Sequence, residues 1–428
     1  MDPYSSIQSQ LEENLASQSI CLPLSEASKS FLKTWRPVVS VDCSPGFWNT
    51  ESKGLCRLRV MIQDQGEPEF CLSYYHDNTS IFSTLYGNFP DVEVSYLPDI
   101  FTQRYPVTVI GVPGESFPYP PPQVYFYNEI GEKLTLTSIV DIVGIAINSE
   151  FHVIGFTPSV PLLSPIPNRR DSILRGLEIC TGSPFVSELL LYLLVSSIQE
   201  RSTLLGSFPI NLTNLASIDS LKSSLQTLTR LVYLDFSLSF MNSSNLVPTK
   251  DPETEKLEPS FLQLPNNTLV IIDETKMTPG ALTAKGLSNL DVLMQVVHSQ
   301  SLVYNFGFSQ INFPTDLRFL VCSTGKSILK IPTAVSVERL NAYEFSEEDR
   351  AYLESCSQII VTLPESLIKV AQDYFVDKRK ENKITPEDFH LILLLTRYTT
   401  QSHNTQTSTQ SHWENALSLF SLFSPLVT

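Results

Sequence analysis

The stretch that decides the fold is LVIIDETKM, residues 269–277, in which four apolar residues run directly into Asp273 and Glu274. A continuous apolar run of this length is typical of a strand in a parallel sheet that is buried on both faces. An acidic pair at the end of such a strand is how nucleotide hydrolases hold Mg²⁺ and a general base. The sequence therefore raises the question whether this chain hydrolyses a nucleotide or only has the fold of a protein that does.

The segments around this stretch alternate between strand-like and helix-like patterns. Strands are predicted at 208–213 (FPINLT), 269–273 and 317–322 (LRFLVC), helices at 185–200, 221–234 and 287–299, and a hairpin at 301–314 (SLVYNFGFSQINFP). This alternation predicts a parallel sheet covered by helices. Beyond residue 345 the pattern is helical to the end of the sequence, with a polar connection at 402–411.

The N-terminal half has a different pattern, made of short β-like segments. Residues 55–64 (LCRLRVMIQD) alternate like a half-buried strand, with Leu58, Val60 and Ile62 on the side expected to face the core. Similar segments continue to residue 147. Several short strands of this size predict a small barrel or sandwich, for which an OB-like barrel is our interpretation.

Composition excludes several classes of function. A net charge of -16 argues against a nucleic-acid-binding surface, because affinity for phosphates comes from clustered Lys and Arg. The seven cysteines include no CxxC pair, so neither a zinc ribbon nor a disulfide framework is predicted. The acidic, polar N-terminus does not resemble a signal peptide, and the longest apolar run (LLLYLLV, 189–195) is too short to span a membrane. We expect an intracellular protein with reduced thiols and a protein partner.

The nucleotide hypothesis requires a glycine-rich loop that brings backbone N–H groups close to phosphates, followed by a lysine. After FPINLT the loop NLASIDS contains no glycine, although Lys222 and Ser223 stand at the head of the next predicted helix. The apolar Ile218 and Leu221 would crowd a phosphate cradle. The one literal Gly-Lys-Ser, 325–327, follows the third strand instead. The sequence therefore predicts the shape of an ATPase without its chemistry.

No other catalytic constellation is present in the sequence. It contains neither the G-x-S-x-G elbow of hydrolases nor the H-E-x-x-H motif of zinc proteases, and its six histidines are scattered. We predict no catalytic residue, no cofactor and no metal ligand. The alternative is an active AAA+-type ATPase remodeller that uses Lys222, Ser223, Asp273 and Glu274. A third class, a single-strand-binding OB module, is disfavoured by the acidic charge.

Four stretches resemble the eukaryotic MCM-binding protein family. They are RLRVMIQDQGEPEF (57–70), LQLPNNTLVIIDET (262–275), NFPTDLRFLVCSTGKSIL (312–329) and KITPEDFHLILLLTRY (383–398). IIDETKM is also similar to the IDEFDKM stretch of MCM ATPase domains, and LRFLVCST to their sensor-1 strand, where Ser323 replaces the expected asparagine. ITPEDFHLILLL resembles their lid helix, with Glu387 where an arginine would lie.

The resemblance implies a regulator of DNA replication that binds MCM helicase subunits and has no ATPase activity. It implies a location in the nucleus, and a second location in the cytoplasm stays open. It implies a role in MCM assembly, protection or removal from chromatin, and in sister-chromatid cohesion. Lys222, Ser223, Asp273, Glu274, Ser323 and Glu387 would be remnants of a nucleotide site. Binding to nucleic acid or membrane is not expected, and residues 170–428 are expected to carry the MCM contact.

The resemblance and the patterns together predict five regions. They are an N-terminal extension (1–50), an OB-like β domain (51–155), a proline-rich linker (156–172), a degenerate MCM/AAA+-like α/β domain (173–345) and a helical lid-like region (346–428).

Overall fold

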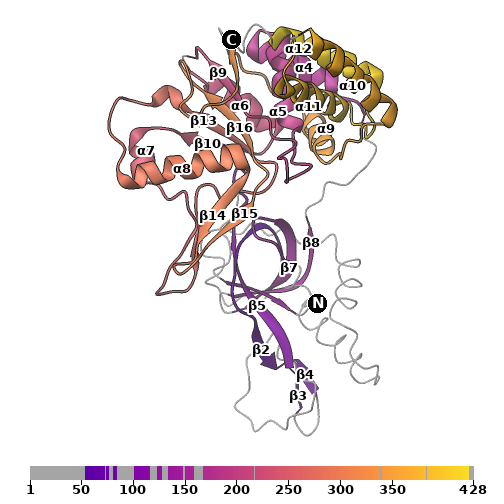
Figure 1. The fold of residues 1–428 in the computed structure, drawn as a ribbon. Helices are drawn as coiled ribbons and strands as arrows, with labels where there is room; N and C mark the ends of the chain where they lie inside the picture. The colour runs from indigo at the N-terminus through magenta and orange to yellow at the C-terminus, as the bar shows by residue number, and fades with distance from the viewer. Residues whose placement is uncertain are drawn as a thin grey trace. The chain divides into compact units, whose positions relative to one another are not determined.

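The computed structural model describes residues 54–72, 74–76, 81–83, 101–115, 123–127, 134–147, 150–158, 167–215, 217–337, 340–381 and 383–423. The predicted N-terminal extension lies outside these ranges. The chain divides into two compact units: Met1–Val160 with Thr249–Pro259, and Pro161–Pro248 with Ser260–Thr428. Figure 1 shows the order of the elements along the chain. A β-rich N-terminal part followed by an α/β part is thus confirmed.

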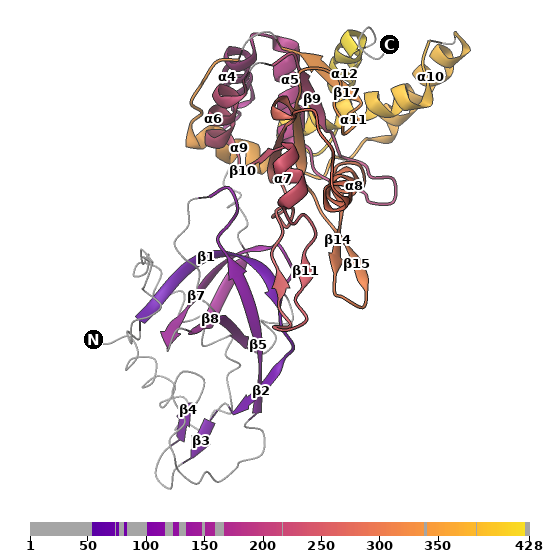
Figure 2. The ribbon, with the colours of Figure 1, turned by 90° about the vertical axis from the view of Figure 1, so that its left-hand side faces the viewer.

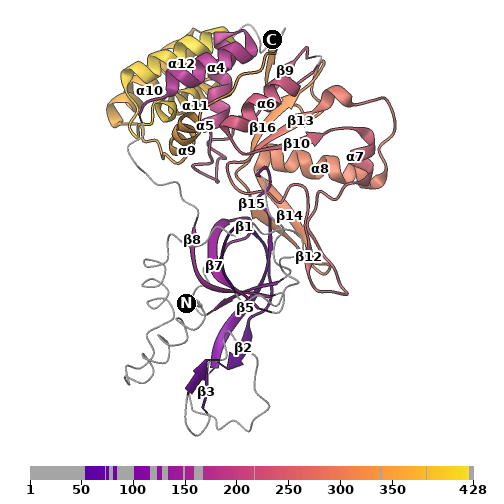
Figure 3. The ribbon, with the colours of Figure 1, turned by 180° about the vertical axis from the view of Figure 1, so that it is seen from behind.

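The first unit is built on six strands of one antiparallel-rich sheet. They are β1 (Gly54–Gln65), β2 (Glu69–Leu72), β5 (Phe101–Ile110), β6 (Gln123–Tyr127), β7 (Ile139–Ile147) and β8 (Glu150–Pro158), while β3 (Tyr74–His76) and β4 (Ile81–Ser83) form a separate small hairpin. Strand β1 pairs with both β5 and β7, β5 with β6, β6 in parallel with β8, and β8 with β7. These pairings close the sheet into a barrel, which Figure 3 shows as a ring.

The barrel core confirms the predicted face of β1. Leu58, Val60 and Ile62 are 2%, 0% and 0% exposed, and they pack with buried side chains from β5, β6, β7 and β8. Met61, on the opposite face of the strand, is buried as well. Gly144 lies at the irregularity in the β7–β8 register, where an added Cβ would come within 2.2 Å of the His152 carbonyl oxygen. Glycine is therefore required for this close approach of the two strands.

The short hairpin β11 (Thr249–Lys250) and β12 (Leu257–Glu258) belongs to the barrel unit although it is distant in sequence. The buried Gln63 donates through Nε2 to the Leu257 carbonyl at 2.8 Å, and Leu257 N–H donates to Asp64 Oδ2 at 2.9 Å. Two polar side chains of β1 are thus hydrogen-bonded to Leu257, which lies 194 residues after Gln63 in the sequence.

The second unit contains a five-stranded parallel sheet. Its strands are β9 (Ile210–Thr213), β10 (Leu231–Asp235), β13 (Leu269–Asp273), β16 (Arg318–Cys322) and β17 (Thr333–Ser336), in the order β10-β13-β16-β9-β17. An antiparallel hairpin, β14 (Ser301–Asn305) with β15 (Gln310–Pro314), confirms the hairpin predicted at 301–314. As predicted, LVIID is fully buried, as is RFLVC of β16.

The prediction of one helix across 221–234 is wrong. Helix α6 (Asp219–Leu228) ends before Thr229, which is extended, and β10 begins at Leu231. The apolar spacing of Leu225, Leu228 and Leu231 fits a continuous helix, which hid the break. Tertiary pairing decides the outcome, because β10 lies in parallel register beside β13.

Helices cover both faces of this sheet. They are α4 (Arg170–Thr181), α5 (Pro184–Val195), α6, α7 (Leu238–Ser243) and α8 (Ala284–Ser299), and Figure 2 shows α6 on one side of the sheet and α8 on the other. Helix α5 is apolar almost all round and begins at Pro184 after Ser183, whose side chain accepts from Val186 N–H. Strand β8 runs to Pro158 and α4 begins at Arg170, so both ends of the predicted linker lie in regular elements.

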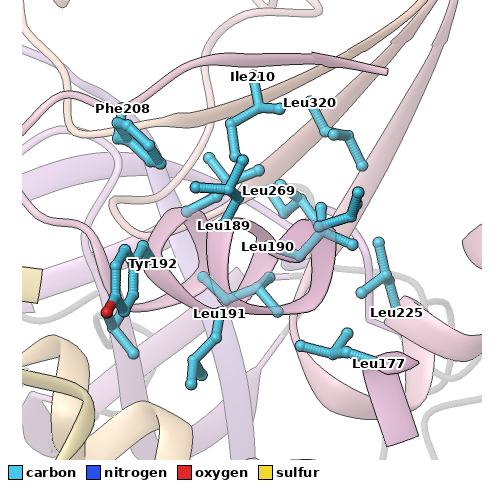
Figure 4. Close-up of a cluster of buried hydrophobic side chains, with 14 of the residues drawn as sticks. Leu177, Leu189, Leu190, Leu191, Tyr192, Phe208, Ile210, Leu225, Leu269 and Leu320 are labelled. Atoms are coloured by element: carbon cyan, nitrogen blue, oxygen red, sulfur yellow. The ribbon is translucent and has the colours of Figure 1, made fainter. Parts of the chain in front are cut away.

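The main core forms around α5. Figure 4 shows side chains of α5 lying against Ile210, Leu269 and Leu320 of the sheet. Alternate strand residues contribute to this cluster, and the intervening ones, such as Val270 and Phe319, are buried outside it. Full burial of each such side chain stabilises the fold by roughly 1.5–3 kcal/mol. Because these residues lie within the strands, their packing also fixes where each strand ends.

The last part of the chain is helical, as predicted. Its helices are α9 (Glu347–Ser357), α10 (Glu365–Lys380), α11 (Pro386–Ser402) and α12 (Gln410–Phe423). Capping boxes begin two of them, Ser346 with Asp349 at α9 and Thr385 with Asp388 at α11. Tyr192 of α5 and Thr399 of α11 are joined by a 2.7 Å hydrogen bond, and both are buried, so these helices pack directly onto the α/β core.

Candidate functional site at the carboxyl edge of the parallel sheet

Four strands of the parallel sheet end at the same edge. The register aligns Asp235 of β10 with Asp273 of β13, and Asp273 with Cys322 of β16. Cys322 is in turn aligned with Leu212 of β9. In open α/β sheets, ligands bind in the crevice outside the carboxyl ends of the strands. The acidic pair predicted from the sequence therefore lies where a nucleotide site would lie.

Asp273 accepts hydrogen bonds from its own chain on both carboxylate oxygens. It is 2% exposed, and its Oδ2 accepts from Tyr233 Oη at 2.7 Å. Its Oδ1 accepts from the backbone N–H of Thr275 at 3.0 Å and from Thr275 Oγ1 at 2.5 Å. Lys276 Nζ lies 3.8 Å from Oδ2. Both carboxylate oxygens are thus used in fixing the turn that follows β13.

Glu274 is also occupied by its own chain. Its Oε1 accepts from Ser327 Oγ at 2.8 Å, and its Oε2 accepts from the backbone N–H of Ile328 at 3.1 Å. Burial raises the pKa of Glu274, and the two hydrogen bonds offset part of that shift. Both donors lie in or directly after the sequence Gly325-Lys326-Ser327. This segment therefore binds a carboxylate of the protein's own chain.

The loop at the phosphate-loop position is filled with apolar side chains. Leu215, Ile218 and Leu221 are 5%, 3% and 0% exposed and belong to the main core. A phosphate cradle needs a loop whose backbone N–H groups line an open concavity. Here the side chains anchor the loop to the core instead.

Lys222 and Ser223 do not converge on a common point. Lys222 Nζ lies over the ring of Tyr233, 4.3 Å from its centroid, and Lys276 approaches the same ring at 5.2 Å. Burial raises the pKa of Tyr233 to about 12, so its hydroxyl stays protonated and donates to Asp273. Ser223 is exposed and donates to the carbonyl of Asp219 within α6.

The two remaining predicted residues occupy different places. Ser323 is 2% exposed, and its Oγ lies 3.0 Å from Asn211 Oδ1 and 2.7 Å from the Gly325 carbonyl. It therefore joins β9 to the segment that covers Glu274. Glu387 is exposed in the first turn of α11, and no contact described for this chain joins it to the sheet edge.

Sequence reasoning missed Tyr233, Lys276 and Ser327 as parts of this edge. Tyr233 was hidden by the wrong helix assignment, since its hydroxyl reaches Asp273 only from a neighbouring strand. Ser327 belongs to a motif dismissed as a phosphate loop. Its position just after the strand beside the acidic one was the available signal that it lies at the same edge.

A second polar cluster lies on the barrel. Arg104 stacks over Tyr125 (4.2 Å) and pairs with Glu69 (2.6 Å), and Tyr125 stacks on His152 (5.5 Å). Tyr127 Oη and His152 Nδ1 are 2.6 Å apart. Burial, with a smaller contribution from the Arg104 charge, lowers the pKa of His152 to about 4. Tyr125 is 8% exposed, too little to offer a stacking platform to bases.

No group of three or more His, Cys, Asp or Glu side chains in the described ranges is placed to hold a metal ion. Among the helices described above, none combines the length and apolar character needed to cross a membrane. Cys180, Cys322 and Cys356 are free and buried.

The fold and the sheet edge define an α/β protein whose acidic strand end is bonded to its own chain. A family model described as Mini-chromosome maintenance replisome factor matches residues 159–422, and the chain belongs to this family. The match takes in the whole parallel sheet and nearly all of the terminal helices.

Three relatives, each named Mini-chromosome maintenance complex-binding protein, illustrate the similarity. The Danio rerio protein is 29% identical over 270 residues, covering 57% of this chain and 43% of the relative. The Homo sapiens protein is 27% identical over 266 residues (56% and 41%), and the Arabidopsis thaliana protein 25% over 271 residues (58% and 46%). The matched part therefore spans less than half the length of these relatives.

Proposed function

We propose that this chain is a non-catalytic regulator of DNA replication that binds MCM helicase subunits. The observation that carries the non-catalytic part is the bonding of Glu274 to Ser327 and Ile328. A general base must be free to accept a proton from the attacking water. Each oxygen of the Glu274 carboxylate is already held by a donor of its own chain, and the neighbouring loop is filled by Leu215 and Ile218 in place of a phosphate cradle.

The choice of an MCM partner is supported by the family and by the sheet. Strand β16, likened above to sensor-1, lies between β9, which leads to the loop at the phosphate-loop position, and the acidic β13. We interpret this as an AAA+-like core, with the terminal helices as the lid-like region. Such a core can present to a helicase subunit a face like that of its neighbour in a ring, while supplying no hydrolytic group.

The barrel supports the OB-like interpretation. Five strands close the ring, β1, β5, β6, β7 and β8, and β2 extends it beside β5. Around the ring the order is β1, β5, β6, β8, β7 and back to β1, with β6 and β8 parallel. A five-stranded Greek-key barrel is the architecture of the OB-fold.

Within this proposal the protein promotes MCM assembly and protection or removes MCM from chromatin. It acts in the nucleus and contributes to sister-chromatid cohesion. The acidic chain favours rapid encounter with a basic partner surface, and apolar contacts determine how long the complex lasts.

The experiment is co-purification of the intact chain with each MCM subunit, together with an ATPase assay of the free chain. Stable capture of one or more MCM subunits with no ATP turnover supports the proposal. Turnover that disappears in Glu274→Gln would favour the alternative, an active ATPase remodeller. Failure to capture any MCM subunit would refute MCM binding.

A further inference from the structure

The hairpin formed by β14 and β15 has an open edge. β15 stands at the end of its sheet, and β14 is the one strand with which it pairs among those described. Figure 2 shows the two strands side by side. An open edge offers backbone donors and acceptors to an added strand.

The hydrogen bonds of the hairpin define which groups face this edge. At the turn, Phe306 N–H donates to the Ser309 carbonyl at 2.9 Å. Because bonded and non-bonded pairs alternate in an antiparallel ladder, the backbone groups of Gln310, Asn312 and Pro314 point away from β14.

The other end of the hairpin follows the same alternation, since Thr315 N–H donates to the Gln300 carbonyl at 2.9 Å. The open edge thus presents two N–H donors, from Gln310 and Asn312. Proline at 314 supplies a carbonyl but no donor.

This edge lacks the charged side chains that commonly protect an edge against strand addition. Residues 301–314 contain no charged side chain, in a chain with a net charge of -16. Natural edge strands are commonly protected by charges, especially Lys. In β15 most side chains are exposed, including Ile311 at 47%, and Phe308 in the turn is 92% exposed.

The hairpin is held in one conformation by aromatic contacts. The ring of Tyr304 lies 4.5 Å from that of Phe313 and 6.5 Å from that of Phe306, measured between centroids. Leu302 and Tyr304 are 1% and 2% exposed. The edge is therefore organised before a partner arrives, which lowers the entropy lost on binding.

We infer that β15 receives an extended segment of the MCM subunit by strand addition, an inference that rests on the proposed function. Charge selects the occupant. A charged segment would lose hydration against an uncharged edge, and an acidic one would be repelled by the acidic chain. The fitting segment is uncharged, with apolar side chains at alternate positions that cover Ile311 and Phe308.

The test uses proline at a position whose N–H faces the open edge. Asn312→Pro removes that donor and leaves every bond to β14 in place. Asn312→Thr is the matched control, because it retains the N–H. Both variants lose the 3.3 Å bond from Gln295 Nε2 to Asn312 Oδ1, so this loss cannot separate them. Gln310→Pro is the second test variant.

Binding of the intact variants to the captured MCM subunit is measured by interferometry, with melting temperatures as the check on folding. We expect Kd to rise at least about tenfold for either proline variant, since a backbone hydrogen bond is lost and the ring obstructs the added strand. Asn312→Thr should stay within about twofold. Amides 310 and 312 should gain protection from hydrogen exchange when the subunit binds.

Each contrary outcome has its own meaning. If the wild-type chain binds and both proline variants bind equally well, the strand-addition inference is wrong and the proposed function stands. If the wild-type chain binds no MCM subunit, the proposed function fails and the inference falls with it. If the free chain is a dimer that Asn312→Pro dissociates, the occupant of the edge is a second copy of this chain, which also refutes the inference.

Discussion

Ser327 Oγ donates to Glu274 Oε1 at 2.8 Å, so the hydroxyl of a Gly-Lys-Ser sequence binds the glutamate that directly follows the buried strand β13. The two residues are 53 positions apart in the sequence. The bond makes the end of β13 a structural junction with the segment after β16.

Glu274→Gln should be tolerated, because the amide oxygen can still accept from one of the two donors, Ser327 or Ile328, and only the other loses its acceptor. We expect the free energy of unfolding to fall by about 1 kcal/mol, less than for Glu274→Ala, and MCM binding to be unchanged. Glu274→Ala is the contrast, since it leaves the Ser327 hydroxyl and the Ile328 N–H without an acceptor, at roughly 1–3 kcal/mol. Loss of activity in cells by Glu274→Gln, with normal protein level and partner binding, would reveal chemistry at this edge.

The same pair of proteins gives a pH test. The folded pKa of Glu274 lies above its ordinary value of 4.5, so the folded state binds more protons in that window. Its contribution to stability therefore falls as pH rises from 4.5 through the folded pKa. Thermal melts of the wild type and Glu274→Gln should show Gln gaining relative stability between acidic and neutral pH. A constant difference would contradict this.

Mg²⁺–ATP should not raise the melting temperature of the chain. A ligand at a hundred times its Kd would add about 2.7 kcal/mol, which a thermal shift assay detects easily. Lys222, which lies over the Tyr233 ring, provides the control. A reproducible shift with ATP that Lys222→Ala abolishes would overturn the prediction.

Val60→Asp should abolish soluble protein, because Val60 is fully buried in the barrel and the carboxylate of the introduced aspartate would have no partner there. Val60→Ala should cost roughly 2 kcal/mol and still fold. Yields and melting temperatures compare the two. Equal tolerance would mean that β1 is wrongly placed.

Arg59 requires a different substitution from the one its sequence position suggests. Strand alternation alone places Arg59 on the face opposite Leu58 and Val60, where Arg59→Glu would be harmless. Arg59 pairs with Glu115 at 3.1 Å and lies 3.7 Å from Asp141, so a glutamate would bring three acids together. Arg59→Gln is the proper probe of a surface role.

His152 should make the barrel sensitive to acid. Its folded pKa of about 4 lies below its ordinary 6.5, so the unfolded chain binds more protons between these values. Stability present above pH 6.5 is lost as pH falls, by about 2 kcal/mol at pH 5. Hydrogen exchange of β6 and β8 at pH 7 and pH 5 measures this, and His152→Asn should reduce the difference. An unchanged pH response in the variant would assign the sensitivity to another group.

The sequence predicted the elements whose burial is strong and local. LVIID and RFLVC are apolar enough to require a position inside a sheet, and alternation in β1 revealed the buried face. Strand β10 was missed because its leucines continue the spacing of α6, and only pairing with β13 makes it a strand.

The candidate site was predictable in its acids but not in their partners. Asp273 and Glu274 follow from the strand that carries them. Tyr233 and Ser327 come from two other elements, 40 and 53 residues away from the acids they bind. Which hydroxyl reaches which carboxylate depends on strand order, and local sequence does not encode that order.

The bond between Gln63 and Leu257 has a consequence for synthesis of the chain. The barrel's own strands have all been translated by residue 158, but the acceptor for the buried Gln63 amide lies 194 residues after it. From residue 158 to Leu257 the chain grows by 99 residues (257 − 158), so at about 5–20 residues per second the nascent barrel waits roughly 5–20 s for that acceptor. During this interval the bond from Gln63 to the Leu257 carbonyl has not formed, so the end of β1 makes this contact only after β11 and β12 have been synthesised.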